Sequence, residues 1–180
     1  AFVTVAFFML PLQVFGASAK ETVEVQVNKV LTTLAEPAFK DQPRDAKIVK
    51  IRSIVNEIFD YTELSKRTLG REWAKFNDQQ QAEFIKLFSD LLEKTYADRL
   101  LSYSNEKVVF DKETVLREGQ VEVTSNIITG DGKKIPLDYR LISKGSTWGV
   151  YDVIIEGISL VKNYRDQFRD ILAKDSPEEV

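Results

Sequence analysis

The side chains available for chemistry are mainly carboxylates and phenols, because the sequence contains no histidine and no cysteine. This composition excludes serine–histidine–aspartate and cysteine–histidine catalysis, as well as almost every kind of zinc site. Asp138 and Asp152 are the most suggestive pair, since neighbouring carboxylates on adjacent strands shift each other's pKa. Strand alternation places them on the face opposite Tyr139 and Tyr151. We therefore expect the two aspartates to lie beside Arg140 on a solvated face.

Length and charge narrow the class of protein further. The 180 residues are 43% apolar and 29% charged, which is enough material for one globular domain with a real core. The net charge of −3 does not suggest the basic surface that binds nucleic acid, so no nucleic-acid partner is expected. The glycines of Gly130-Asp131-Gly132 fit a hairpin loop better than a phosphate-binding loop, because no helix pattern follows them.

The first 19 residues differ from the rest of the chain. AFVTVAFFMLPLQVFGASA carries no charge, is interrupted by Pro11, and ends in Ala17-Ser18-Ala19, the small-x-small pattern that signal peptidase recognises. We expect residues 1–19 to be the remnant of a cleaved signal peptide, with the mature chain beginning at Lys20. An uncleaved membrane anchor is the competing interpretation, although the apolar run is short for a membrane span.

The first half of the remaining chain has the apolar spacing of helices. Apolar residues recur every three or four positions, which predicts helices over 21–35, 45–60, 62–69 and from Asn77 to about 104. Val23, Val25 and Val27 also fit a strand, so the start of the first helix is ambiguous. Gly70 is a candidate left-handed C-cap, and Asn77 with Gln80 forms a candidate capping box.

From Lys107 the apolar period changes to two, which predicts strands. The candidates are 107–111, 113–118, 120–129, 134–143 and 147–156. With three residues in each hairpin loop, one face collects the apolar side chains of Val121, Val123, Ile127, Ile135, Leu137, Tyr139, Leu141, Tyr151, Val153 and Ile155. We therefore expect a single α+β domain over 20–180. Its helical half covers about 20–104, its twisted antiparallel sheet of about four strands covers about 107–156, and a C-terminal helix covers about 158–173.

Residue patterns alone predict an exported α+β binding domain and leave its ligand open. Apolar stripes such as Phe84, Phe88 and Tyr96 are typical of a packed core, and periodicity does not distinguish a core from the wall of a cavity. Trp73 and Trp148 are likewise more typical of packing than of stacking on a ligand.

Two long stretches resemble a known family. They are IFDYTELSKRTLGREWAKFNDQQQAEFIKLFSDLLEKTYADRL and LDYRLISKGSTWGVYDVIIEGISLVKNYRDQF. Both are similar to the toluene-tolerance family, the periplasmic phospholipid carriers of the Mla intermembrane lipid transport system. The most specific pieces are Leu69-Gly70-x-x-Trp73, Phe84 through Ala97, and Trp148 through Ser159.

The resemblance implies an NTF2-like or cystatin-like fold in which helices cup a sheet and acyl chains enter the gap. It implies a periplasmic monomer that is not an enzyme and needs no cofactor, with phospholipid as its ligand. The implied protein partners are an inner-membrane complex of an MCE-domain protein with an ABC transporter, and an outer-membrane lipoprotein complex. A hopanoid carrier, a non-lipid adaptor and an NTF2-like enzyme using the aspartates and tyrosines above are the alternatives.

The predicted lipid-binding residues combine the apolar sheet face, one side of the longest helix and the family motif. Ile158 joins them because it follows Gly157, where we expect its side chain to point between the two layers. The full set is Leu69, Trp73, Phe84, Phe88, Leu91, Tyr96, Leu100, Val123, Ile127, Leu137, Tyr139, Leu141, Val153, Ile155 and Ile158.

Overall fold

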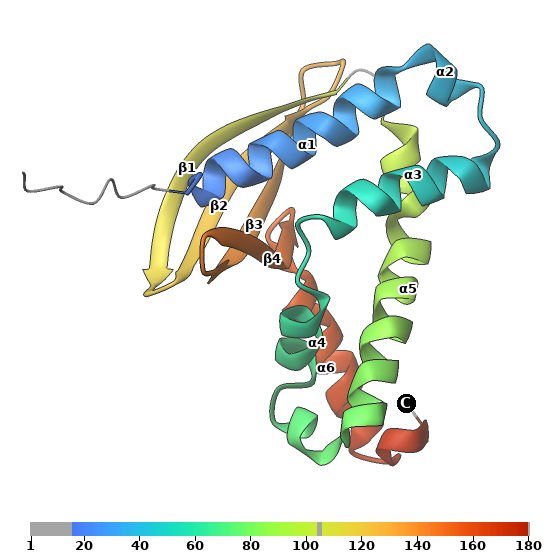
Figure 1. Ribbon diagram of the computed structural model, residues 1–180, viewed down its shortest axis with the longest axis vertical. Helices are drawn as coiled ribbons and strands as arrows, with labels where there is room; N and C mark the ends of the chain where they lie inside the picture. Colours follow the sequence, from blue (N-terminus) through green and yellow to red (C-terminus); the bar gives the residue numbers. More distant parts are fainter. Residues whose placement is uncertain (1–15, 104–105, 180) are drawn as a thin grey trace, which may run out of the picture.

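Helices form the first half of the chain in the computed structural model, which describes residues 16–103 and 106–179 (Figure 1). They are α1 (Ala19–Ala35), α2 (Pro37–Lys40), α3 (Arg44–Asn56), α4 (Tyr61–Leu69), the 3-10 helix η1 (Gly70–Lys75) and α5 (Asp78–Ser102). After the sheet come α6 (Leu160–Leu172) and a 3-10 turn, η2 (Pro177–Glu179). The expected signal peptide lies outside the described residues except for 16–19.

Side-chain caps fix where the helices begin. Ser18 accepts a hydrogen bond from the Glu21 backbone N–H at 3.1 Å, and its own N–H donates to the Glu21 carboxylate at 2.9 Å. This capping box resolves the ambiguous start of α1 in favour of a helix. The predicted box at α5 is confirmed, with Asn77 and Gln80 exchanging bonds of 2.8 and 3.0 Å. Gly70 ends α4 with the positive φ that was predicted, 58°, but its ψ of −119° lies outside the left-handed helical region.

The second half of the chain is an antiparallel meander with the strand order β1-β2-β3-β4-β5. The strands are β1 (Lys107–Arg117), β2 (Gln120–Ile128), β3 (Lys134–Lys144), β4 (Thr147–Ile155) and β5 (Ile158–Ser159). The first two predicted strands are one, β1, with a register shift between Phe110 and Glu113. The two-residue edge strand β5 was not predicted. The α+β class is confirmed.

The register between β2 and β3 is the predicted one, with Val121 opposite Leu141 and Val123 opposite Tyr139. The next hairpin differs from the prediction, because Lys144 pairs with Thr147 across a loop of two residues rather than three. A bulge compensates for the missing loop residue. Arg140 pairs with Asp152 but Leu141 pairs with Val150, which leaves Tyr151 as the extra residue.

The bulge at Tyr151 decides which side chains face each side of β4. Val150 takes the place on the inner apolar face that the sequence pattern gave to Tyr151, whereas Val153 stays there as predicted. The Tyr151 ring instead lies under the Arg67 guanidinium, 3.9 Å from its central carbon, and its hydroxyl is 3.3 Å from Gln120 Oε1. Placing Tyr151 on the inner face was therefore wrong.

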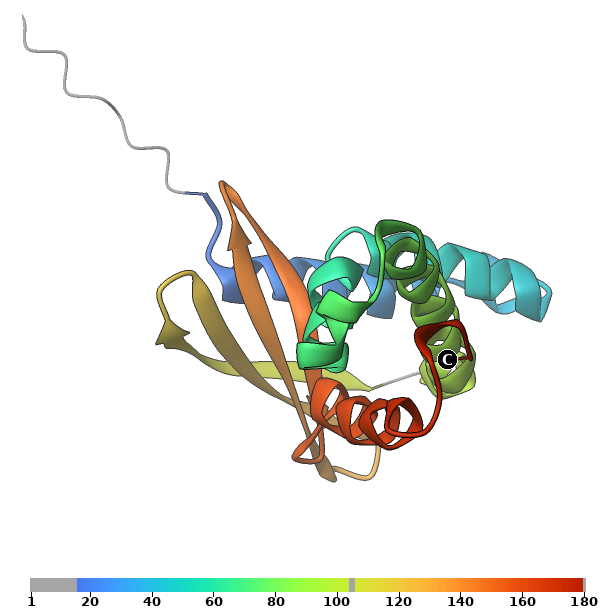
Figure 2. The same ribbon diagram turned by 90° about the horizontal axis from the view of Figure 1, so that it is seen from below.

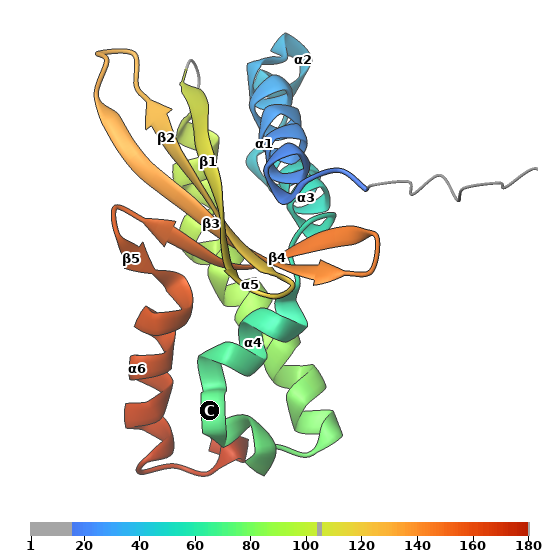
Figure 3. The same ribbon diagram turned by 90° about the vertical axis from the view of Figure 1, so that its left-hand side faces the viewer.

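The helices divide into two groups relative to the sheet. Helices α1 and α3 lie together on one side of the sheet, and α6 runs away from its β5 edge (Figure 3). Seen from below, α4, the first half of α5 and α6 form a three-helix group (Figure 2). Helix α5 takes part in both groups, because its second half returns towards the sheet.

Each group has its own hydrophobic core. The upper core joins the inner sheet face to α1 through residues such as Val23, Val123 and Leu141. The lower core joins α4, η1, α5 and α6, and aromatic rings dominate it. The Phe84 and Phe168 ring centroids are 5.1 Å apart, as are those of Phe88 and Tyr164.

Asp152 was expected to be solvated, but it is buried. Its exposed fraction is 2%, because α6 packs over it. Its carboxylate accepts hydrogen bonds from Ser159 Oγ at 2.6 Å and from the Val161 N–H at 3.0 Å. Arg140 Nη1 lies 3.5 Å from the same carboxylate. A buried carboxylate on β4 thus holds the first turn of α6 against the sheet.

Asp138, on the same outer face, generates a testable prediction. Burial raises the pKa of its carboxyl, and Glu122 and Asp111 add to the shift. The folded chain therefore holds this proton more tightly than the unfolded chain, and stability falls as pH rises through the two pKa values. In the wild type, the Ser125 N–H donates to Asp138 Oδ1 at 3.1 Å. Asp138→Asn removes the charge of the side chain and keeps an oxygen that can accept this hydrogen bond. We expect a higher melting temperature than wild type at neutral pH and none of this gain at acidic pH.

Asp131→Asn is the matched control, because the Thr129 hydroxyl lowers the pKa of Asp131. Its stabilising effect is present above the unfolded-state pKa, so this variant should melt below wild type at neutral pH. Thermal melts at the two pH values check both signs. An Asp138→Asn variant that melts below wild type at neutral pH would contradict the prediction.

Candidate functional site

A cavity of about 250 Å³ lies between the inner face of the sheet and helices α1, α3 and α5. Its wall is almost entirely aliphatic and aromatic. The sheet contributes Val108, Ile127, Leu137, Tyr139, Val150, Val153 and Ile155. The helices contribute, among others, Val23, Val27, Val30 and Leu34 from α1, Ile48, Ile51, Ile54 and Val55 from α3, and Leu92, Tyr96, Ala97 and Leu100 from α5.

Helical spacing explains how α1 and α3 reach the cavity. Val23, Val27, Val30 and Leu34 recur every three or four residues, so they form a single stripe along α1. Of the polar residues between them, Gln26 also lines the cavity. Because α1 lies across the inner face, its stripe becomes one side of the cavity.

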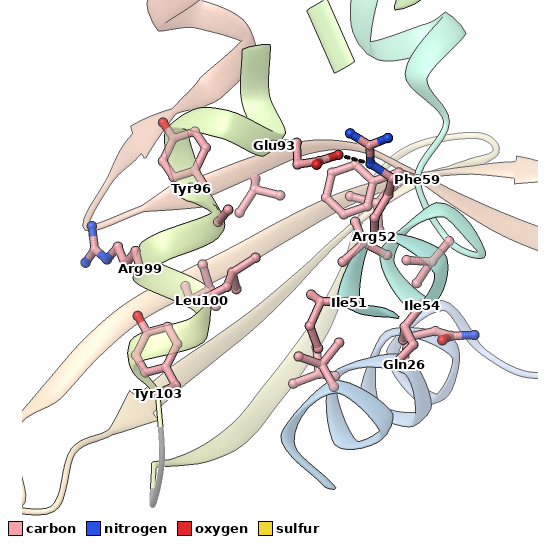
Figure 4. A pocket seen from close by; sticks show the side chains of 18 of the residues that line it. Gln26, Ile51, Arg52, Ile54, Phe59, Glu93, Tyr96, Arg99, Leu100 and Tyr103 are labelled. Atoms are coloured by element: carbon pink, nitrogen blue, oxygen red, sulfur yellow. Dashed lines mark hydrogen bonds and ion pairs between the residues drawn. The ribbon is translucent and has the colours of Figure 1, made fainter. Parts of the chain in front are cut away.

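Polar side chains gather where α3 approaches α5 (Figure 4). Arg52 Nε on α3 donates a hydrogen bond to the Glu93 carboxylate on α5, and Arg52 Nη2 lies 3.5 Å from Asp90 Oδ1. The hydrogen bond to Glu93 raises the pKa of Arg52, so the guanidinium stays charged. Further along, Arg44 of α3 forms a second ion pair with Asp98 of α5, with 2.7 Å between Nη2 and Oδ1. These ion pairs tie one wall of the cavity to the other.

Among the described residues, Gln26 of α1 is the one amide that lines the cavity. Its Nε2 donates to Glu57 Oε2 at 3.2 Å. Its Oε1 is buried and has no hydrogen-bond partner within the described part of the chain. The side chain labelled in Figure 4 therefore leaves an acceptor available at the margin of an otherwise apolar wall.

Burial keeps two phenols of the wall neutral. Burial raises the pKa of Tyr139, and burial raises the pKa of Tyr61 to about 12, so both phenols are neutral at physiological pH. Asp138 and Asp152 are not part of the lining. Of the four residues considered for an acid–base group, Tyr139 alone reaches the cavity. The geometry suits the enclosure of apolar chains.

Within residues 16–103 and 106–179, two kinds of feature are absent. No cluster of three or more aspartate, glutamate, histidine or cysteine side chains is arranged to hold a metal ion. None of the helices combines the length and the apolar character needed to cross a bilayer.

Seven of the fifteen predicted lipid-binding residues line this cavity. They are Tyr96, Leu100, Ile127, Leu137, Tyr139, Val153 and Ile155. They come from the last turns of α5 and from three neighbouring strands. The alternation of β2 and β3, together with the compensating bulge in β4, brings them together.

The other eight lie elsewhere. Leu69, Trp73, Phe84 and Phe88 belong to the lower core. Val123 and Leu141 are fully buried in the upper core, where they pack directly against their neighbours. Leu91 is 42% exposed and Ile158 is 61% exposed. The expectation that Ile158 points between the layers was wrong, because β5 forms the edge of the sheet.

The α1 and α3 walls are not among the residues predicted for the site. Both stripes were visible as helical periodicity, but nothing in their composition separated them from core stripes. The polar residues Gln26, Arg52 and Glu93 were missed for a different reason. Their positions depend on how α3 crosses α5, which local pattern does not specify.

The fold and the cavity define an α+β protein that encloses an apolar site between a curved sheet and helices, a form typical of sites for apolar small molecules. A sequence model of the MlaC protein family matches residues 24–180, and the chain belongs to this family. The toluene-tolerance resemblance is thereby confirmed.

Individual relatives agree. The intermembrane phospholipid transport system binding protein MlaC of Haemophilus influenzae is 30% identical over 153 residues, which cover 78% of this chain and 72% of that protein. Toluene tolerance protein ttg2D of Pseudomonas putida is 26% identical over 126 residues, which cover 69% of this chain and 59% of that protein. A phospholipid-binding protein from Ralstonia solanacearum, solved in complex with a phospholipid, superposes with a TM-score of 0.77 at 29% identity. That match covers 88% of this chain and 89% of the solved chain.

Two leucines on β3 test the difference between cavity and core. Leu141 is fully buried in the upper core, whereas Leu137 lines the cavity and is half-buried. Leu141→Ala should lower the free energy of unfolding by about 2–5 kcal/mol, because it opens a void in a packed region. Leu137→Ala should cost less than about half of that, since its side chain already borders open space. Denaturant unfolding of both variants checks the order, and equal losses would mean that the Leu137 site is packed.

Proposed function

We propose that this chain is a periplasmic lipid carrier that holds phospholipid acyl chains in the apolar cavity. In this proposal it moves lipid between an inner-membrane complex of an MCE-domain protein with an ABC transporter and an outer-membrane lipoprotein complex. The observation that carries the proposal is the apolar cavity between sheet and helices in a chain of the MlaC family. The phospholipid complex of the Ralstonia solanacearum protein, which shares the fold, supports it.

The energetics of lipid transfer suit an apolar cavity without reactive groups. Burying one methylene is worth roughly 0.8 kcal/mol, so an acyl chain of about 16 carbons represents on the order of 13 kcal/mol. A lipid does not leave a bilayer for water at that cost unless another apolar environment replaces the bilayer. Binding by apolar walls also leaves the carrier able to release its ligand, because the receiving membrane offers equivalent burial.

The proposed contacts are the seven predicted residues that line the cavity, joined by the α1 and α3 stripes. Tyr139 would present a neutral phenol to the lipid, since burial raises its pKa. The headgroup would remain near the margin where polar residues such as Gln26 and Arg52 lie. The other eight predicted residues are proposed to support the fold or to lie outside the cavity.

Co-purified lipid tests the proposal directly. We expect organic extraction of the protein, prepared without a delipidation step, to yield near-stoichiometric phospholipid by mass spectrometry. A polycyclic lipid in its place would favour the hopanoid alternative. A preparation without bound lipid would favour an adaptor or an enzyme and would contradict the carrier proposal.

Variants of one lining residue and one exposed residue localise the ligand. Leu137→Trp fills part of the cavity with an apolar ring and should reduce the retained lipid several-fold while the chain remains folded. Leu137→Glu places a charge where burial is costly and should also release lipid. Ile158→Glu is the control, because Ile158 is largely exposed and outside the lining. Lipid retained in both Leu137 variants, or lost in Ile158→Glu, would place the ligand elsewhere.

We further propose that residues 1–19 are removed on export, which leaves Lys20 as the first residue of the mature domain. Cleavage there removes the Ser18 cap and the buried Ala19. The Lys20 backbone nitrogen already donates to Glu113 Oε2 at 2.8 Å, so the ammonium group formed by cleavage would have a carboxylate partner at the new start of α1. N-terminal sequencing of the exported protein should begin at Lys20. A membrane-bound form that keeps residues 1–19 would indicate an anchor instead.

A further inference from the structure

A second cavity, of about 270 Å³, lies on the side of the sheet opposite the apolar cavity. Four basic side chains from three elements line it: Arg67 of α4, Arg140 of β3, and Lys162 and Arg165 of α6. The fold brings these four residues together although they are far apart in the chain.

The arginines are held in place by contacts that leave part of each guanidinium free. Arg67 is paired with Glu63 at 2.6 Å and stacks on the Tyr151 ring. Arg165 donates from Nε and Nη2 to the backbone oxygen of Arg67, at 2.9 and 2.6 Å. Arg165 therefore points its guanidinium towards α4 without a carboxylate to neutralise it. A ligand that binds here meets side chains that are already ordered, which reduces the entropy cost of binding.

The charges around this cavity do not balance. Glu63 pairs with Arg67, and Glu122 pairs with Arg140 at 2.9 Å. Asp152 is the one carboxylate in the lining, and its oxygens are occupied by Ser159, Val161 and Arg140. Within the described part of the chain, Lys162 and Arg165 form no ion pair. The four basic side chains thus face three carboxylates, Glu63, Glu122 and Asp152, and an excess of one positive charge remains at this cavity.

We propose that this cavity binds a phosphate group. Guanidinium groups match phosphate oxygens with pairs of parallel N–H donors, and Lys adds a point charge. Donors that converge from α4, β3 and α6 suit a tetrahedral anion with several acceptor oxygens better than a planar carboxylate with two. Asp152 opposes binding, but three donors already stabilise its charge. The site is separate from the apolar cavity, so it does not depend on the carrier proposal.

Inorganic phosphate titrated into the whole protein at constant ionic strength tests the site, with chloride as the reference anion. Arg165→Gln removes the charge but keeps an N–H for the Arg67 backbone oxygen, and Lys162→Gln removes the neighbouring charge. We expect each variant to weaken phosphate binding about tenfold or more, the loss of one charge-assisted hydrogen bond. Arg169→Gln is the matched control, because it removes one charge from the same helix outside this cavity and should bind like wild type.

Calorimetry gives the dissociation constants, and the extracted phospholipid content of each variant should equal that of wild type. If Arg165→Gln does not fold, Lys162→Gln decides, since its side chain is exposed and makes no ion pair. The proposal is overturned if wild type does not bind phosphate, or if the variants bind it as wild type does.

The phosphate can belong to a lipid headgroup or to a free solute, and vesicle binding distinguishes these sources. Vesicles of phosphatidylcholine, with and without phosphatidylglycerol, are sedimented with wild type and Arg165→Gln. Binding that requires phosphatidylglycerol, disappears in Arg165→Gln and is competed by inorganic phosphate assigns the site to a membrane surface. Phosphate binding without vesicle binding assigns it to a free phosphorylated solute.

Discussion

Strand β4 has to serve two layers at once, and the extra residue at Tyr151 allows it to do so. Below the bulge, Val153 and Ile155 continue the apolar alternation of β3 and face the cavity. At the bulge itself, Tyr151 and Asp152 turn to the outer side, where they contact α4 and α6. A strand of strict alternation would put Tyr151 into the cavity and leave Arg67 without its aromatic partner. The apolar wall, the attachment of α6 and the basic outer cavity all depend on this one irregularity.

The helices form two layers, of which one is densely packed and the other encloses the apolar cavity. Below the sheet, aromatic rings of α5 and α6 such as Phe84, Phe88 and Phe168 interdigitate into a dense core, which Leu64 and Leu69 of α4 complete. Beside the sheet, α1 and α3 present smaller aliphatic side chains and leave space between themselves and β3. Both layers use apolar residues at helical spacing, but the lower one brings large rings from two helices, α5 and α6, to one point. Size and convergence of side chains, more than hydrophobicity, decide which layer contains a cavity.

The sequence predicted the fold class, the helix caps and the inner face of β2 and β3, because these follow from local rules of spacing and capping. It did not predict that the second hairpin loop is short and that a bulge corrects it, since both alternatives give Val153 the same face. It also did not separate Phe84 and Phe88, which are core, from Tyr96 and Leu100, which line the cavity on the same helix. The distinction depends on which part of α5 packs against α6 and which part faces the sheet. Asp152 was misjudged for a related reason, because the pattern of β4 carries no information about the helix that covers it.

Helix α5 spans both layers as one uninterrupted element of 25 residues, about 37 Å long. Its first turns are fixed in the aromatic core, so its last turns give the cavity one immobile side. Any widening must therefore come from the side formed by α1 and α3, which is joined to α5 through the exposed ion pairs of Arg44 and Arg52. Dissolved salt screens such pairs. Higher ionic strength should therefore make it easier for this cavity to widen, although most of its wall is apolar.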